Sequence, residues 1–352
     1  MSDFLFEYGL FATKALTIVL GILITLAFFV AIVLSRKKEK EESYLEIENI
    51  NDKFEDLQDN LESEILSKSD YKKLQKLRKK EKKQEEKAKK KSNKQDNVKL
   101  LEEERPRVFV LRFCGDLTAS PVENLREEIT AILMVAKETD EVLILLESGG
   151  GIVHNYGLAA AQLQRIKEKN IKLVASVDLI AASGGYMMAC VANTIIAAPF
   201  AIVGSIGVLA QLPNFNKLLQ KHNIDIEHHT SGEYKSTLTM LGKNTDKGRD
   251  KFIAELEDTH KLFKEFVKNN RSQVDLKKIS TGEYWYGLQA MDLNLIDGIK
   301  TSDNYLIEKC KDHDVFSVEY KIHESLKEKL SNILSKSVQH VLSKLTCKTA
   351  LM

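Results

Sequence analysis

Two short stretches of this 352-residue sequence combine a serine with glycines in a pattern that suits acyl transfer. The first is Glu147-Ser148-Gly149-Gly150-Gly151 and the second is Ala182-Ser183-Gly184-Gly185. Each follows an apolar run and precedes a helical pattern, and backbone N–H groups are exposed at such junctions. The N–H groups of Gly151 and Gly184 can therefore flank the Ser183 hydroxyl. A nucleophile between two donors for a developing oxyanion is the arrangement that acyl transfer needs.

Each stretch has a simpler explanation when it is taken alone. The glycine spacing at 149–151 fits neither of the common phosphate-binding patterns. A serine before two glycines, such as Ser183, can simply cap a helix. The combination of the two stretches is more specific than either one.

A serine nucleophile needs a base, and the sequence offers two kinds. None of the eight histidines lies in the 38 residues after Ser183, and His154 fits a helix start more simply. A lysine can serve only when it is uncharged, because an ammonium group cannot accept a proton. Lys235 stands among hydroxyl and apolar residues at 230–240, whereas most other lysines stand in solvated runs. Composition alone favours Lys235 only modestly.

The elements around these stretches predict an α/β domain. Four apolar runs have the length and composition of buried strands, at 107–113, 141–147, 172–178 and 194–198. Helical patterns separate the first three runs, which is typical of parallel βαβ units. The first helix has a capping pattern, with Ser120 as N-cap, Pro121 at the first helical position and Glu123 closing a capping box.

Composition argues against several other kinds of site. The 52 Lys and Arg nearly balance the 51 Asp and Glu, so no overall field favours nucleic acid, and no nucleic-acid partner is expected. The four cysteines form no C-x-x-C pair, so we predict neither a disulfide framework nor a metal site.

A membrane anchor is predicted over residues 15–34, with residues 1–14 as its N-terminal flank. The segment has twenty uncharged residues, which at ~1.5 Å each would span the ~30 Å of a bilayer core. It is longer than the apolar part of a signal peptide, and no matching cleavage site follows. The uncharged run 187–210 is instead assigned to the α/β core, because Pro199, Gly204 and Gly207 interrupt it.

Residues 35–104 are predicted to form a charged, largely helical linker without proline or glycine. An apolar stripe at helical spacing suggests a short coiled coil, a helix against the main domain, or a helix on the membrane surface; it comprises Ile47, Ile50, Phe54, Leu57, Leu61 and Ile65. Thirteen Lys or Arg within 71–95 favour anionic lipid or solvent as the neighbour. The main domain is expected over 105–322, followed by an amphipathic helix over 323–352.

The chain resembles the signal peptide peptidase A family of membrane serine peptidases, most closely its SohB branch. The matching motifs run along essentially the whole chain and include ESGGGIVHNYGLAAAQLQR, DLIAASGGYMMACVAN, APFAIVGSIGV, GEYKSTLTMLG and WYGLQAMDLNLID. The resemblance implies a crotonase-like fold shared with the Clp protease, with a parallel sheet and flanking helices. The family's glycine loop usually reads S-P-G-G, and here Gly149 replaces the proline, which makes the loop less rigid.

The resemblance also implies roles for individual residues. Ser183 resembles the family's nucleophile and Lys235 its general base, while Gly151 and Gly184 resemble the oxyanion-hole donors. Ser205, in GSIGV, resembles a hydrogen-bond partner that holds the lysine. The implied activity is endopeptidase cleavage of signal-peptide or other membrane-derived segments, with no cofactor. A ring-like homo-oligomer is also implied, in which the lysine can approach the serine of a neighbouring subunit.

Two questions stay open at this stage. The basic residues after the predicted anchor, at 36–38 and 40, place the C-terminal bulk in the cytoplasm by the positive-inside rule. The family resemblance instead implies a single-pass protein of the inner membrane with a periplasmic catalytic domain, which we take as the expectation. The alternatives to a peptidase are a catalytically silent membrane scaffold of the same fold and a polyanion-binding protein acting through 71–95.

Overall fold

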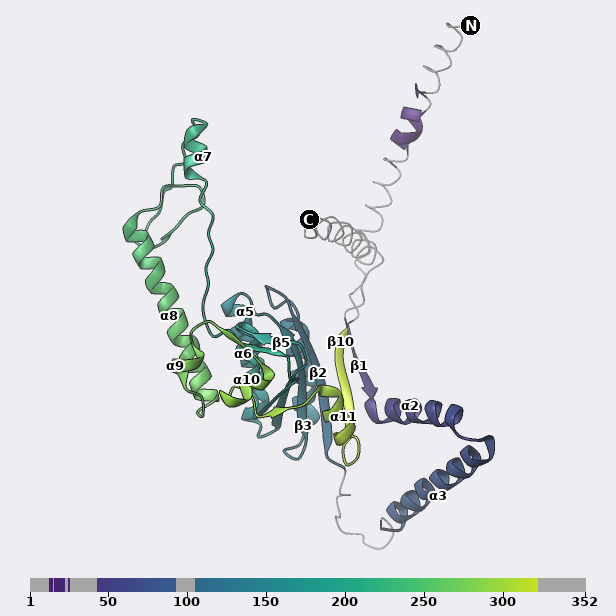
Figure 1. Ribbon diagram of the computed structural model, residues 1–352. Helices are drawn as coiled ribbons and strands as arrows, with labels where there is room; N and C mark the ends of the chain where they lie inside the picture. Colours follow the sequence, from purple (N-terminus) through teal and green to yellow (C-terminus); the bar gives the residue numbers. More distant parts are fainter. Residues whose placement is uncertain (1–12, 15, 23–24, 26–42, 93–104, 322–352) are drawn as a thin grey trace, which may run out of the picture. The chain divides into compact units, whose positions relative to one another are not determined.

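The computed structural model describes residues 13–14, 16–22, 25, 43–92 and 105–321 (Figure 1). The chain divides into two units, one of Leu45–Tyr320 and one of Met1–Tyr44 with Lys321–Met352. The predicted anchor lies mostly outside the described residues, and the predicted C-terminal helix lies wholly outside them. Within the described part of the chain, no helix combines the length and apolar character needed to cross a bilayer.

A central sheet forms the core of Leu45–Tyr320, in the strand order β1-β10-β2-β3-β4-β6-β9. Its neighbours from β10 to β9 all pair in parallel. The strands are β1 (Tyr44–Asn49), β2 (Arg107–Gly115), β3 (Glu141–Ser148), β4 (Lys172–Val177), β6 (Thr194–Ala197), β9 (Gly298–Ile299) and β10 (Asp314–Lys321). The four strands predicted from apolar runs are thereby confirmed, with small differences at their ends.

Helices cover both faces of this sheet, because successive strand residues point to opposite sides. On one face, Phe109, Leu111 and Phe113 join a large apolar core. The helices that surround or contribute to this core are α4 (Val122–Val135), α5 (Val153–Glu168), α6 (Gly184–Ala189), α8 (Asp246–Asn270), α9 (Leu276–Ile279) and α10 (Gly287–Asp292). On the other face, Val108 and Val110 pack with residues of α2 (Ile50–Ile65) and α11 (Ser302–Lys309).

Three short strands extend the sheet at the carboxyl end of β3. They are β5 (Ile180–Ala182), β7 (Ile202–Gly204) and β8 (Tyr284–Tyr286). β5 pairs in parallel with β3 at Ser148↔Ala181 and with β7, and β7 pairs antiparallel with β8. The uncharged run 187–210 thus contributes α6, β6 and β7, which confirms its assignment to the α/β core.

The predicted start of α4 is wrong by one residue. The helix begins at Val122, its N-cap is Pro121, and no side chain caps it. Ser120 does not act as the cap, and its own N–H donates to Asp116 Oδ1 at 2.9 Å. The same carboxylate oxygen accepts the N–H of Thr118 at 3.0 Å. A carboxylate earlier in the loop therefore organises the turn, because an ionised oxygen is a stronger acceptor than a hydroxyl.

The apolar stripe of the linker is helical only in part. Ile47 belongs to β1, so its assignment to a helical seam is wrong: the pairing of β1 with β10 overrides the local periodicity. α2 starts at Ile50, and Ile50 and Phe54 pack against the sheet. Leu57, Leu61 and Ile65 are exposed. Only the first turns of α2 therefore use the stripe.

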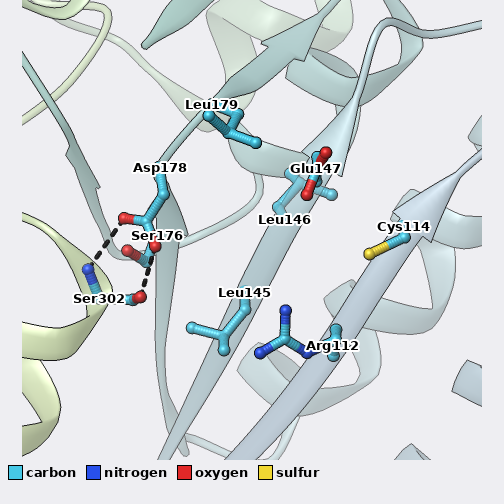
Figure 2. A pocket seen from close by; sticks show the side chains of 9 residues that line it. All are labelled: Arg112, Cys114, Leu145, Leu146, Glu147, Ser176, Asp178, Leu179 and Ser302. Atoms are coloured by element: carbon cyan, nitrogen blue, oxygen red, sulfur yellow. Dashed lines mark hydrogen bonds between the residues drawn. The ribbon is translucent and has the colours of Figure 1, made fainter. Parts of the chain in front are cut away.

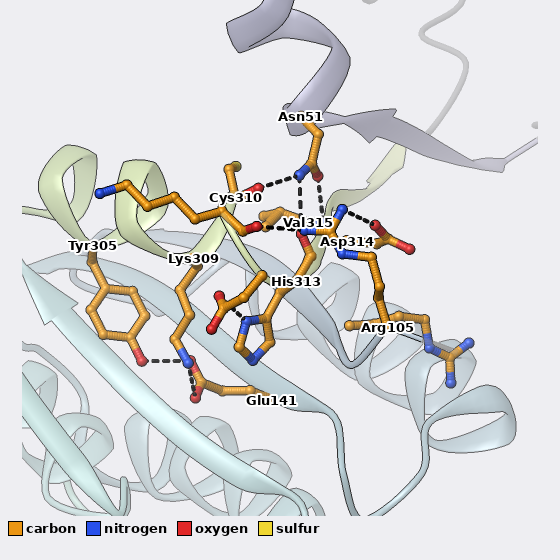
Figure 3. A network of polar contacts seen from close by, with 12 residues as sticks. Asn51, Arg105, Glu141, Tyr305, Lys309, Cys310, His313, Asp314 and Val315 are labelled. Atoms are coloured by element: carbon orange, nitrogen blue, oxygen red, sulfur yellow. Dashed lines mark hydrogen bonds and ion pairs between the residues drawn. The ribbon is translucent and has the colours of Figure 1, made fainter. Parts of the chain in front are cut away.

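A single asparagine fastens the start of α2 to the sheet (Figure 3). Asn51 Nδ2 donates to the carbonyls of Cys310 at 3.1 Å and His313 at 3.0 Å, and Oδ1 accepts the N–H of Val315 at 2.7 Å. The following helix, α3 (Lys68–Ser92), contacts α2 through Arg78, which pairs with Asp59 and Glu62.

A buried glutamate between α4 and β10 makes stability depend on pH. Glu128 Oε1 accepts the N–H of Tyr320 at 2.9 Å, and burial raises the pKa of Glu128 to about 7. The folded state thus keeps a proton that the unfolded chain releases near pH 4.5, so stability falls as pH rises from about 4.5 to 7. Glu128→Gln keeps an acceptor for Tyr320 and cannot ionise. The expected quantity is the unfolding free energy of Glu128→Gln minus that of the wild type. We expect this difference to be roughly 1–3 kcal/mol larger at pH 8 than at pH 4.5.

Urea unfolding of the two proteins at both pH values measures this difference. Equal pH dependence in the two proteins would exclude Glu128 as the source.

Candidate active site

Ser183 occupies a strained turn between β5 and α6. Its φ of 52° and ψ of −117° are unusual for a residue with a side chain. Two backbone bonds hold this geometry: Ser183 N–H donates to Gly204 O at 2.8 Å, and Ser183 O accepts the N–H of Met187 at 2.9 Å. The turn places Ser183, which is only partly buried, at the start of a helix.

The glycine loop after β3 lies directly against this turn. Gly150 has a φ of +87°, and a Cβ atom on it would lie 2.6 Å from Gly184 N and 2.7 Å from Ser183 Cβ. A Cβ on Gly185 would lie 2.5 Å from Ser148 O. Such close approach leaves no room for side chains at either position. The structure thus brings the two predicted stretches together, and it identifies Gly150 as a contact that sequence reasoning did not single out.

The amides of the loop differ in what they bind. Gly150 N–H donates to Ser148 Oγ at 3.1 Å. Among the described residues, the N–H groups of Gly151 and Gly184 have no hydrogen-bond acceptor. Gly184 is the first residue of α6, where a helix leaves its amides without an internal partner. Both predicted oxyanion donors are therefore available to a ligand.

A buried hydroxyl pair stands behind the loop, and sequence reasoning assigned it no role. Tyr156, on α5, is fully buried, and its hydroxyl lies 2.5 Å from Ser148 Oγ and donates to Asp116 O at 2.6 Å. Burial raises the pKa of the Tyr156 phenol, so it remains a neutral donor. The visible signals were a serine before the glycines and a tyrosine early in the next helix.

Ser205 follows the residue that binds the Ser183 turn. It follows Gly204, whose carbonyl binds Ser183 N–H, and its own N–H donates to Glu283 O at 2.7 Å. Trp285 packs so closely on Gly204 that a Cβ there would lie 2.7 Å from the indole ring. The region 284–286 thus packs beneath the site.

Lys235 lies in a different part of the fold from Ser183. It is exposed in the connection between α7 (Asn216–Lys221) and α8. The adjacent Tyr234 ring lies 5.7 Å from the Lys247 ammonium, near the start of α8. Lys247 precedes His260 by 13 residues, about 20 Å along the helix axis, and His260 is the α8 residue that contacts Ile206 O beyond Ser205, at 3.2 Å. Figure 1 shows the α7–α8 connection at the end of α8 farther from β5 and α6. One chain therefore does not bring Lys235 to Ser183.

A small separate pocket lies near the carboxyl ends of β2, β3 and β4 (Figure 2). Its volume is about 60 Å³, room for a few water molecules. Asp178 accepts the N–H of Ser302 at 2.9 Å on one side, and the buried Ser176 Oγ has no protein partner among the described residues. Ser183 does not line this pocket.

Two neighbouring glycines should differ in how well they tolerate replacement by alanine. A Cβ on Gly149 meets only Ile180 Cδ1 at 3.8 Å, an ordinary contact, whereas Gly150 has a positive φ and no space. We expect Gly149→Ala to keep near wild-type activity. Gly150→Ala should lower the free energy of unfolding by roughly 2–4 kcal/mol and kcat by ~100-fold.

Denaturant unfolding and peptide hydrolysis of the two variants provide the measurement. Similar losses in both would contradict the described loop geometry.

The chain is similar to known peptidases along most of its length. It matches the Peptidase family S49 N-terminal model over residues 3–163 and the Peptidase family S49 model over residues 165–315. It is 48% identical to "Probable protease SohB" of Haemophilus influenzae, over 99% of this chain and 98% of that relative. Identity to "Probable protease SohB" of Buchnera aphidicola subsp. Schlechtendalia chinensis is 48%, over 87% of this chain and 100% of that relative.

Proposed function

The chain belongs to peptidase family S49, and we propose that this peptidase is a serine endopeptidase with Ser183 as nucleophile and Lys235 as general base. The observation that carries the proposal is the Ser183 turn, which sets a strained serine beside the amides of Gly151 and Gly184, for which the described part of the chain offers no acceptor. Strain of this kind persists only where the surroundings enforce it, and it is common at catalytic groups.

The proposed reaction proceeds through an acyl-enzyme. Neutral Lys235 takes the Ser183 proton, and the alkoxide attacks the peptide carbonyl. The N–H groups of Gly151 and Gly184 hold the oxyanion. Lys235 then protonates the leaving amine, and water cleaves the ester by the reverse sequence. Ser205 orients the lysine, and no cofactor takes part.

We further propose that Lys235 acts on a neighbouring copy of the chain. The support is twofold: Lys235 is held near the start of α8, away from Ser183 of its own chain, and the α7–α8 region exposes apolar side chains. The exposed residues include Leu212, Phe215, Leu218, Ile224 and Ile226. Exposed apolar side chains that fall within one segment favour contact with another protein surface. A ring-like homo-oligomer would cover it and complete the dyad.

The remaining parts of the proposal follow the family resemblance. Residues 15–34 anchor the protein once in the inner membrane, with the catalytic domain in the periplasm. The substrates are extended peptide segments with apolar side chains, such as signal-peptide remnants. The fold is crotonase-like and related to that of the Clp protease, which the parallel sheet and the added β5–β7–β8 strands support.

A fluorophosphonate reagent tests this function against a silent scaffold of the same fold. The reagent phosphonylates an activated serine, with loss of fluoride. Treatment of the full-length chain should label the peptide that contains Ser183, as detected by mass spectrometry. Absence of the label, together with absence of peptide hydrolysis, would favour the scaffold.

A further inference from the structure

Tyr156 contacts both halves of the candidate site. Its ring packs on the nucleophile turn, since a Cβ on Gly184 would lie 2.4 Å from Tyr156 Cγ. Its hydroxyl reaches the glycine loop through Ser148 Oγ, 2.5 Å away. Both Tyr156 and Ser148 are buried, so water does not compete for these bonds. One side chain thus connects the segments that carry the two amide donors.

The hydrogen bonds through Tyr156 have a definite direction. The phenol has one hydrogen, which it donates to Asp116 O at 2.6 Å. Ser148 must then donate its hydrogen toward Tyr156, and Ser148 Oγ accepts the N–H of Gly150 at 3.1 Å. The series of hydrogen bonds therefore runs from Gly150 N–H through two hydroxyls to the carbonyl of Asp116. Hydrogen bonds in such a buried series reinforce one another.

The bond from Gly150 N–H to Ser148 Oγ turns that amide toward the protein interior. The next amide of the loop, that of Gly151, is available to the oxyanion. Gly151 is held in turn, because a Cβ on it would lie 2.1 Å from Leu117 O, and Ile152 N–H donates to the same oxygen at 2.9 Å. The loop is thereby fixed on both sides of its free amide.

We propose that Tyr156 is a positioning residue for the oxyanion hole, acting through Ser148 to aim the Gly151 amide and through its ring to seat Gly184. The inference rests on the proposed serine-peptidase function. Without the phenol, the Ser148 hydroxyl turns to its other acceptor, Gly115 O at 3.3 Å, and its bond to Gly150 weakens. The misaligned donors then stabilise the oxyanion less well, whereas their contact with the ground-state carbonyl changes little.

The test is Tyr156→Phe in the full-length chain. We expect kcat for a peptide substrate to fall by about 10–100-fold with KM within about twofold, because donor alignment matters mainly in the transition state. A substrate-matched peptide aldehyde, which forms an oxyanion on Ser183, should bind more weakly by the same factor as kcat/KM falls. A non-cleavable ground-state analogue should bind unchanged. Ser148→Ala should lower kcat similarly. Adding Tyr156→Phe to it should lower kcat little further, since both residues act through the same series of hydrogen bonds.

Tyr305→Phe is the matched control, because it also removes a tyrosine hydroxyl, one bonded to Glu141 Oε1 at 2.5 Å outside the site. It should leave kcat and aldehyde binding unchanged. The inference is overturned if Tyr156→Phe matches this control, or if the effects of Tyr156→Phe and Ser148→Ala simply add. The proposed function survives that result as long as the wild type hydrolyses the peptide and Ser183→Ala does not. A wild type without Ser183-dependent hydrolysis overturns the proposed function as well.

Discussion

Replacing Ser183 with alanine is expected to lower kcat for peptide hydrolysis by roughly 10⁴-fold or more, since the acyl-enzyme cannot form without the hydroxyl. The fold should persist, because the turn is held by backbone bonds to Gly204 and Met187 that alanine retains. Hydrolysis by the full-length chain, with circular dichroism as the folding check, measures both effects. A wild-type rate in the alanine variant would exclude Ser183 as nucleophile.

The strain at Ser183 gives this prediction a second, independent readout. Alanine keeps the cost of a side chain at a φ of 52°, whereas glycine adopts that conformation freely. Ser183→Gly should therefore be as inactive as Ser183→Ala, yet more stable by about 1–2 kcal/mol. Denaturant unfolding compares the two variants. A glycine variant less stable than the alanine variant would mean that the turn is not strained.

Lys235→Ala should be nearly as damaging as Ser183→Ala, with a loss in kcat of ~10³-fold or more. If the lysine of one copy serves the serine of the next, two inactive variants can complement each other. Co-expression of Ser183→Ala with Lys235→Ala chains places some intact Ser183 residues beside intact Lys235 residues of a neighbour. We expect such mixed assemblies to recover a measurable fraction of wild-type activity, assayed after copurification through different tags.

Two controls sharpen the complementation experiment. Lys243→Ala changes an exposed lysine in the same α7–α8 connection and should remain active. A chain with both Ser183→Ala and Lys235→Ala, co-expressed with the Ser183→Ala chain, should recover nothing. Wild-type activity in Lys235→Ala would remove the lysine from the mechanism. An inactive Lys235→Ala variant without recovery in mixed assemblies would place its action within one chain.

The elements set by local pattern were predictable. The runs that became β2, β3, β4 and β6 are apolar enough to require burial wherever they pair. The errors arose where a partner outside the local pattern intervenes, one far along the chain and one in the preceding loop. Ile47 fits a helical stripe, yet β1 pairs with β10, which lies some 270 residues later in the chain. Ser120 has the chemistry of a cap, yet Asp116 takes its N–H.

The candidate site divides in the same way. Residue types and order in the two loops were enough to indicate Ser183 with the amides of Gly151 and Gly184, because a nucleophile and oxyanion donors need those types at strand ends. The register Ser148↔Ala181 set the two loops in contact, and the bond to Ser148 Oγ directed the Gly150 amide to the interior. Composition favoured Lys235 only modestly and the family resemblance implied its role as a base, whereas the structure places the adjacent Tyr234 beside Lys247, near the start of α8. The chemistry that a side chain can perform follows from its residue type, which the sequence states directly. Which side chains lie close together, and in which direction their hydrogen bonds donate, depend on contacts between distant segments, which local sequence does not encode.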